Sequence, residues 1–478
     1  MSDLRSSKLK ALLNVDDAPR KQSAPGQAPE PQSASANTPL VSTPRIEELD
    51  SSVQQAVEEP RSIEATGMPP SFLADLAIKH LYFGGSMQAG QIAQAVQLHF
   101  SSVMDPILRT LKTQHLVEVT GGSTLNPGSY QYVITDKGGE RARELLERNR
   151  YVGPCPVTLD HYIKVVKLQA QNRPLIKDAD VRQAMEGLIL SDDVIERIGP
   201  AVNSYESLFV YGPPGNGKTS IARAISRSLL PGNIMIPYAI FEDGQVIKVF
   251  DPVTHEPVPS EDAQLTGVSR SDKRWKRCRP PVVITGGELT LLDLELIWSD
   301  TSRFYEAPLQ LKANNGLLVV DDFGRQQMAP GDLLNRWIVP LEDRLDFLTF
   351  HTGKKFAVPF ETLIVFSTNL DPLALVDEAF LRRISHKLGI GDPSEAQYRE
   401  ILMALCETRN FKFDEAAYDY LMQEYYVAMA RPLRACHPRD LLKQMVTFAT
   451  YRDEAMVMTE KLVDLAAHSY FADFFKAA

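Results

Sequence analysis

The sequence predicts an α/β protein in which a parallel β-sheet is covered by helices, followed by a smaller helical region. Three observations lead to this fold class. Between residues 207 and 393, strand-like apolar runs alternate with helix-like segments, which is typical of a parallel sheet with helices on both faces. A glycine-rich loop joins the first apolar run to the first helical segment. After residue 393 the pattern is almost wholly helical.

The length and composition fit a protein of several domains. The 478 residues exceed what one hydrophobic core usually organises. A net charge of −10 argues against a generally basic protein that coats nucleic acid. The four cysteines lie far apart with no Cys-x-x-Cys pair, so neither a disulfide framework nor a zinc site is predicted. Because no signal segment and no apolar run of about 18 residues stand out, we expect a cytoplasmic protein without membrane insertion.

Composition divides the chain into five regions. Residues 1–68 are rich in Pro, Ser, Ala and Gln. We expect a disordered tail there, since such a segment buries too little apolar surface to offset its loss of conformational entropy. Residues 69–150 form a small domain, and residues 151–206 are interpreted as a helical connector leading into the α/β core. That core spans residues 207–393, and residues 394–478 form a helical lid with the C-terminal helices.

The small domain carries three helical patterns, two strand-like segments and a charged helix. The helical patterns cover residues 71–83, 89–99 and 101–115, the strands cover 116–119 and 130–135, and the charged helix covers 140–150. This order resembles a winged-helix domain, with residues 101–115 as the candidate recognition helix. Across the whole small domain, basic and acidic residues are nearly balanced, so its charge does not favour binding to DNA. We therefore favour contact with a protein and keep duplex DNA as the alternative.

The glycine-rich loop has the G-x-x-x-x-G-K-T pattern of a P-loop. It consists of Gly212, Pro213, Pro214, Gly215, Asn216, Gly217, Lys218 and Thr219, with Ser220 following. Glycines allow backbone N–H groups to approach phosphate oxygens, and the following helix N-terminus adds partial positive charge. Lys218 would contact the β- and γ-phosphates, and the Thr219 hydroxyl would bind Mg²⁺. The sequence therefore predicts that the chain binds ATP with Mg²⁺.

A second apolar run, at residues 317–320, ends in two carboxylates, Asp321 and Asp322. The carboxyl end of a parallel strand faces the crevice in which ligands bind. Asp321 would hold Mg²⁺ through its water shell, and Asp322 would orient or polarise the attacking water. An acidic pair at the end of a strand can also be purely structural. Its position after a P-loop favours the functional interpretation.

Taken in order, the motifs resemble those of the AAA+ ATPases over about residues 190–450. The matching segments are the P-loop, Asp321-Asp322, Ser367-Thr368-Asn369, Leu381-Arg382-Arg383 and Pro438-Arg439-Asp440. The resemblance implies that Asn369 is the sensor-1 residue that helps to place the water, and that Arg439 is the sensor-2 residue of the lid. It also implies that Arg382 and Arg383 are arginine fingers offered to the ATP of a neighbouring subunit. The family usually has Glu where this chain has Asp322, so slow hydrolysis is an alternative.

Three further segments are interpreted from their patterns. Residues 234–241 and 246–251 are predicted to form one hairpin, and residues 346–350 and 355–360 another. The second hairpin resembles that of the pre-sensor hairpin group, which includes the MoxR-like ATPases. Residues 270–279 hold six basic residues and one Trp, and are interpreted as a pore loop that grips an anionic client or DNA, or as a solvated loop. Residues 193–200 are predicted to wall an adenine pocket.

The favoured function follows from the resemblance. It implies a homo-oligomeric ring, with a hexamer favoured, that hydrolyses ATP to remodel a macromolecular client. We favour a protein client, which the winged-helix domain would target. One alternative is a DNA-associated regulator or loader whose winged helix, or residues 270–279, would bind DNA. Another is a nucleotide-gated scaffold with little turnover.

Overall fold

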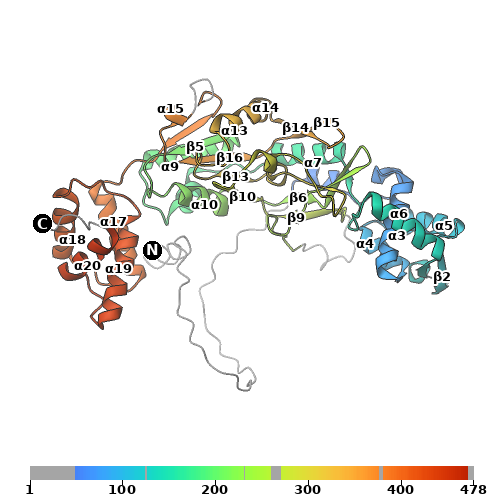
Figure 1. The fold of residues 1–478 in the computed structure, drawn as a ribbon, viewed down its shortest axis with the longest axis horizontal. Coiled ribbons are helices and arrows are strands. Elements are labelled where there is room, and N and C mark those ends of the chain that lie inside the picture. Colours follow the sequence, from blue (N-terminus) through green and yellow to red (C-terminus); the bar gives the residue numbers. More distant parts are fainter. Residues whose placement is uncertain (1–48, 124–125, 231, 260–270, 376–380, 472–478) are drawn as a thin grey trace, which may run out of the picture.

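The computed structural model shows the arrangement of three groups of elements (Figure 1). The described residues are 49–123, 126–230, 232–259, 271–375 and 381–471. Helices of the C-terminal region lie at one end, the small N-terminal domain lies at the other, and two β-sheets lie between them (Figure 1). Most of the predicted disordered tail falls outside the described residues.

The larger parallel sheet is the core that the sequence predicted. Its order is β10 (Val282–Thr285), β13 (Leu317–Val320), β16 (Leu363–Thr368), β5 (Ser207–Tyr211) and β17 (His386–Gly389). All four neighbouring pairs are parallel, and the first strand along the chain lies between the fourth and the fifth. The apolar runs at residues 207–211, 317–320 and 363–366 are buried because helices cover both faces of the sheet. The predicted fold class is confirmed.

Alternating side chains of the sheet pack against different helices. On β5, Leu208 and Val210 share a core with α8 (Asp178–Met185), α9 (Asp192–Ser204) and α10 (Lys218–Ser228). Phe209 belongs to the opposite core, with α13 (Pro330–Arg336) and Trp337, which precedes α14 (Ile338–Asp343). A helix on each face is what parallel connections require, since each crossover returns over the sheet.

A second sheet was not predicted as a unit. It has the order β11 (Ile297–Trp298), β12 (Tyr305–Glu306), β8 (Gln245–Lys248), β7 (Ala239–Glu242) and β4 (Val157–Thr158). It shares one core with α7 (Leu159–Gln171), the β6–β9 ribbon (Ile234–Pro237 and Trp275–Cys278) and the β14–β15 hairpin (Leu345–Thr349 and Lys355–Pro359). The helical connector predicted for 151–206 contains helices α7, α8 and α9, but its first part differs from the prediction because β4 is a strand and both β4 and α7 belong to the core of the second sheet. Both predicted hairpins are found, the first as β7–β8 after the separate strand β6.

The small domain follows the predicted order of helices and strands. It contains α3 (Pro70–Gly84), β1 (Ser86–Gln88), α4 (Ala89–Val96), η2 (Phe100–Met104), α5 (Asp105–Thr113), β2 (Val117–Gly121), η3 (Pro127–Ser129), β3 (Gln131–Ile134) and α6 (Asp136–Arg148). The strands form a sheet in the order β1-β3-β2. The predicted strands at 116–119 and 130–135 are β2 and β3, and β1 adds a short third strand.

The predicted boundary of the disordered tail, at residue 68, lies too far along the chain, because ordered structure begins before it. Residues 49–68 contain α2 (Ser51–Ala56) and η1 (Glu64–Thr66), and Val53 and Val57 are buried in the core of the second sheet. Asp50 caps α2 by accepting a hydrogen bond from Ser52 N–H at 2.8 Å. The helix cap and the burial of two valines stabilise this segment. They offset the loss of conformational entropy that was expected to keep it disordered.

The helical lid consists of α17 (Glu395–Thr408), α18 (Glu415–Tyr420), η5 (Leu421–Val427), α19 (His437–Arg452) and α20 (Glu460–Phe471). The remaining short elements are η4 (Leu291–Leu294), α12 (Leu309–Lys312) and α15 (Pro372–Leu375). Among the helices of the described ranges, none combines the length and the apolar character needed to cross a bilayer.

Candidate nucleotide-binding site

The P-loop joins the end of β5 to the start of α10. Gly212, Gly215 and Gly217 have φ angles of +141°, +83° and +86°, a region that side chains with a Cβ rarely adopt. At Gly212 a Cβ would also lie 2.1 Å from the Ile390 carbonyl oxygen. The loop therefore needs glycine for its conformation and for its close approach to the chain after β17.

Lys218 lies inside this loop, as the sequence predicted. Its ammonium group donates hydrogen bonds to the carbonyl oxygens of Gly212 at 2.9 Å and Pro213 at 2.8 Å. Burial lowers the pKa of Lys218, and the nearby carboxylates of Asp321 and Asp322 oppose that shift. A cation held in a loop of backbone groups is suited to bind phosphate oxygens.

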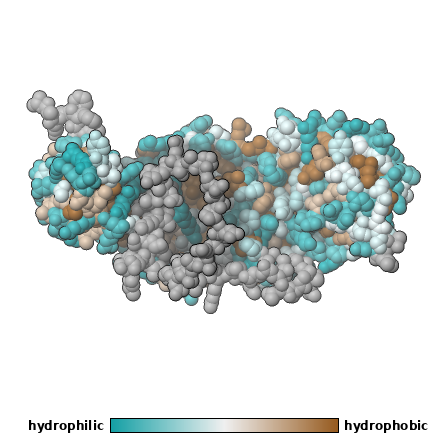
Figure 2. All heavy atoms as spheres, turned by 90° about the horizontal axis from the view of Figure 1, so that it is seen from below, coloured by the Kyte–Doolittle hydropathy of each residue, from teal (hydrophilic) through white to brown (hydrophobic). Residues whose placement is uncertain are grey.

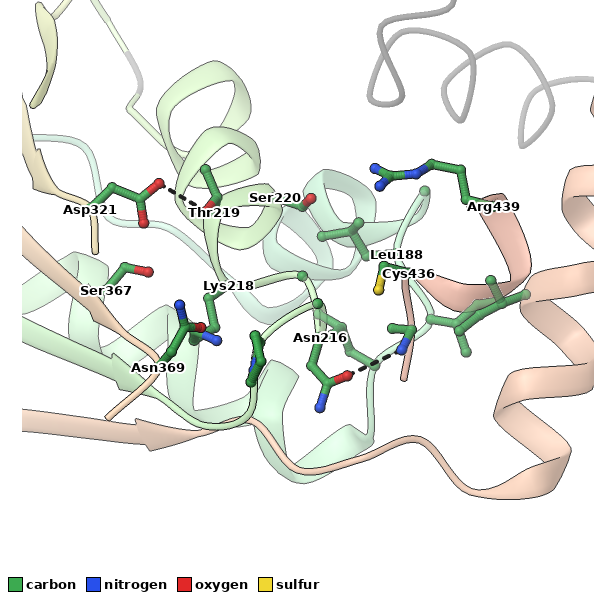
Figure 3. Close-up of a pocket in the computed structure, with 18 of the residues that line it drawn as sticks. Leu188, Asn216, Lys218, Thr219, Ser220, Asp321, Ser367, Asn369, Cys436 and Arg439 are labelled. Atoms are coloured by element: carbon green, nitrogen blue, oxygen red, sulfur yellow. Dashed lines mark hydrogen bonds between the residues drawn. The ribbon is translucent and has the colours of Figure 1, made fainter. Parts of the chain in front are cut away.

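Thr219 and Asp321 come together across two elements. The Thr219 hydroxyl donates a hydrogen bond to Asp321 Oδ2 at 2.9 Å, which links the start of α10 to the end of β13 (Figure 3). A hydroxyl and a carboxylate are hard oxygen ligands of the kind that Mg²⁺ prefers, and Mg²⁺ usually takes its other ligands from water and substrate phosphates. These two residues fit the predicted metal site.

Asp322 and Asn369 also meet, from the ends of neighbouring strands. Asn369 Nδ2 donates a hydrogen bond to Asp322 Oδ1 at 3.0 Å. Asp322 has a φ of +48°, in the left-handed region. Both residues line the same cavity as Lys218 and Thr219. The structure thus brings the predicted catalytic carboxylate and the predicted sensor-1 amide to one place.

The cavity over the P-loop has a volume of about 340 Å³ and two unlike halves. The half beside the P-loop is polar and also includes Asp321, Asp322, Ser367 and Asn369. The other half is apolar and is lined by Gly187, Leu188, Ile189, Leu190, Ile401, Ala404, Leu405 and Cys436. A flat apolar base fits such a slot.

Residues 193–200, which were predicted to wall an adenine pocket, do not line this cavity. Val194 and Ile198 are buried in the core beneath the sheet, so they are not available to a ligand. Four residues shortly before α9, from Gly187 to Leu190, line the cavity instead. The apolar residues of 193–200 could not by themselves show that they face the sheet.

The predicted lid arginine lines the cavity, and the predicted fingers do not. Arg439 lies on the lid side, at the opposite side of the pocket from Asp321, and its guanidinium contacts Asp440 at 2.8 Å (Figure 3). Arg383 forms an ion pair with Glu342 at 2.6 Å. Glu342 lies 41 positions before Arg383 in the sequence, so local sequence could not predict this ion pair. Arg382 is exposed.

The basic segment does not form the predicted loop. Within its described part, residues 271–279, a turn leads into strand β9 (Trp275–Cys278), which pairs antiparallel with β6. Arg274 is 1% exposed and forms an ion pair with Asp272, which is fully buried, at 2.8 Å. Arg274 also donates hydrogen bonds to the carbonyl oxygens of Thr66 at 2.8 Å and Pro156 at 3.2 Å. The pore-loop interpretation is wrong for Arg274, which joins three chain segments inside the protein.

Two residues around the site, Asp392 and Arg434, were missed. Asn216 of the P-loop hydrogen-bonds to Asp392, and Asp392 forms an ion pair with Arg434. Asp392 and Arg434 match no motif and are far from the P-loop in sequence, so only the fold could bring them together.

Comparisons with known proteins found one matching family model and several weakly similar solved structures. A family model described as a domain of unknown function (DUF8689) matches residues 394–469, which is the lid. No curated protein matches the chain. Among solved structures, the RuvB Holliday junction branch migration motor of Thermotoga maritima is 15% identical with a TM-score of 0.31, over 68% of this chain and 72% of its own. NtrX of Brucella abortus in complex with ADP is 14% identical with a TM-score of 0.37, over 68% and 64%. These likenesses are too weak to indicate an activity, a client or an assembly.

The structure itself defines the class of fold. It is an α/β fold in which a P-loop connects a central strand of a parallel sheet to the following helix, and residues of the helical lid line the cavity beside that loop.

Proposed function

We propose that this protein binds Mg²⁺–ATP in the cavity between the P-loop and the lid and hydrolyses it. One observation carries the proposal: three pairs of complementary groups converge on a single cavity. Lys218 lies within the phosphate loop, Thr219 is paired with Asp321, and Asp322 is paired with Asn369. A chance P-loop pattern would not bring these partners from three different strands.

Each group has a role that its position allows. Lys218 would exchange its two carbonyl partners for β- and γ-phosphate oxygens. Thr219 and Asp321 would hold Mg²⁺, which neutralises charge on those phosphates when bound. Asp322 would orient the attacking water, with Asn369 fixing the carboxylate. The apolar half of the cavity would hold the adenine ring against Leu188 and Leu405.

The energy of hydrolysis would serve to remodel a macromolecular client, for which we favour a protein. In the small domain, Arg109 of the candidate recognition helix α5 forms an ion pair with Asp105 at 2.7 Å, so part of its charge is already satisfied. The surface at this end of the molecule mixes hydrophobic with hydrophilic residues (Figure 2). Exposed apolar side chains there include Phe83, at 66%. Mixed surface with paired charges suits a protein partner better than the DNA backbone.

The test is nucleotide binding and phosphate release by the parent chain and by Lys218→Ala. We expect the variant to bind ATP at least about 100-fold more weakly, because it loses two charge-assisted contacts with phosphate. Lys167→Ala changes an exposed lysine on α7 and is the matched control. Equal affinity of Lys218→Ala and the parent would refute the site. Tight ATP binding without any phosphate release by the parent would instead support the scaffold alternative.

A further inference from the structure

Three segments that are distant in sequence meet at the side chain of Asn216. They are the P-loop itself at Asn216, the connection after β17 at Gly391 and Asp392, and the lid segment before α19 at residues 434–436. Asn216 joins all three. Its Nδ2 donates hydrogen bonds to Asp392 Oδ1 at 2.8 Å and to the Gly391 carbonyl oxygen at 3.0 Å. Its Oδ1 accepts a hydrogen bond from the Ala435 N–H at 3.1 Å (Figure 3).

Asp392 has a second partner in the lid. Its carboxylate forms an ion pair with Arg434, and the two side chains are 36% and 21% exposed. The Asp392 carboxylate therefore accepts hydrogen bonds from the P-loop residue Asn216 and from the lid residue Arg434. An isolated surface ion pair contributes little, but a shared carboxylate that also binds a buried amide is a network. Asn216 is only 4% exposed.

The lid segment also packs directly on the P-loop backbone. A Cβ at Gly215 would lie 2.4 Å from Cys436 Sγ and 3.9 Å from Arg434 Cβ. Arg434 is near enough to Lys218 that its positive charge helps to lower the pKa of Lys218, after burial and against Asp321 and Asp322. By pairing with Arg434, Asp392 partly offsets a cation beside the phosphate site.

We propose that Asp392 is a positioning residue of the nucleotide site, which holds the lid segment 434–436 against the P-loop through Asn216 and Arg434. Asp392 does not itself line the cavity, whereas Ala435, Cys436 and Arg439 of the lid do. Its effect is therefore on how long nucleotide stays bound and not on the chemical step. The proposal rests on the proposed function, because it concerns the same cavity.

The experiment measures dissociation of a fluorescent ADP analogue, together with kcat and KM for ATP, in the full chain. Asp392→Ala is expected to speed dissociation at least about 10-fold and to raise KM, with kcat within about 2-fold of the parent. That pattern marks loss of uniform binding and not of transition-state stabilisation. Arg434→Gln is the second variant, and the double variant should show less than the sum of the two single effects because both remove the same pair.

Arg399→Gln is the matched control, since it breaks an ion pair with Glu415 inside the lid, where both side chains are exposed. Circular dichroism checks that each variant folds. If Asp392→Ala misfolds, Arg434→Gln alone carries the test. Unchanged dissociation in the folded variants, or a fall in kcat at unchanged KM, would overturn the role of Asp392. A parent chain that binds no nucleotide would overturn the proposed function as well, so the two failures are distinguishable.

Discussion

At the scale of single residues, the backbone at position 322 bears on the type of side chain found there. With a φ of +48°, Asp322 adopts the left-handed conformation, which Asp tolerates better than most side chains because its short polar group bonds locally. The AAA+ ATPases that the motifs resemble usually have Glu at this position, which is why slow hydrolysis is an alternative. The hydrogen bond from Asn369 holds the Asp322 carboxylate at the lining of the cavity.

This geometry predicts the behaviour of Asp322→Asn. ATP affinity should stay within a few-fold of the parent, because the P-loop contacts are untouched. Phosphate release should fall by about 10²–10⁴-fold, the usual contribution of a general base. Equilibrium binding of labelled ATP and steady-state phosphate release give the two values. Unchanged turnover in the variant would place the water-orienting group elsewhere.

The local motifs were predictable from the sequence, and the partners of those motifs were not. A P-loop is a contiguous pattern whose chemistry depends on neighbouring positions, so Lys218, Thr219 and the strand ending at Asp321 could be placed. The partner of Arg383 at position 342, and those of Asn216 at 392 and 435, depend on how distant segments pack. No spacing rule connects such residues.

At the scale of elements, the segment around β9 shows how a basic run can belong to the interior. The sequence indicated a gripping pore loop or a solvated loop, and both interpretations place the charges outside the protein interior, where charged residues usually lie. The exception requires a partner, and Asp272 provides it two positions before Arg274. With carbonyl oxygens of Thr66 and Pro156 as further acceptors, the guanidinium is compensated. In β9 the end residues Trp275 and Cys278 are buried, and Lys276 and Arg277 between them are partly exposed.

Arg274→Ala should therefore act on stability. Removing one partner leaves the Asp272 carboxylate buried without compensation, which costs about 3–5 kcal/mol. Chemical denaturation of the full chain, followed by a probe in the core that the second sheet shares with the β6–β9 ribbon, such as Trp275 fluorescence, measures the loss. Lys273→Ala changes an exposed neighbour and should leave the midpoint almost unchanged. A folded Arg274→Ala chain with parental stability would restore the loop interpretation.

At the scale of the whole molecule, the sequence predicted the order of domains better than their connections. The parallel sheet, the lid and the small N-terminal domain follow from local periodicity and long apolar runs. The second sheet does not, because its strands come from five separate stretches of the chain and several are only two residues long. Strands this short carry no measurable alternation, and residues 151–171 therefore seemed to be part of a connector.

The proposed assembly into a ring can be tested at Arg382. Arg382 is exposed and does not line the cavity of its own chain. Arg383 beside it is held by Glu342. An arginine finger from a neighbouring subunit would act on the developing charge of the γ-phosphoryl group and contribute about 10³–10⁵-fold to turnover.

In the ring model, Arg382→Ala should keep ATP affinity within a few-fold and lose hydrolysis on that scale. Arg383→Ala is the matched comparison and should lose less, since its guanidinium already has a structural partner. Mixing Arg382→Ala with Lys218→Ala subunits should restore part of the activity, because an intact P-loop on one subunit then meets an intact finger on its neighbour. The assay is phosphate release across several mixing ratios, with subunit exchange confirmed by a fluorescence label. If exchange occurs and no ratio restores activity, hydrolysis is completed within one chain, and Arg382 is an ordinary exposed arginine.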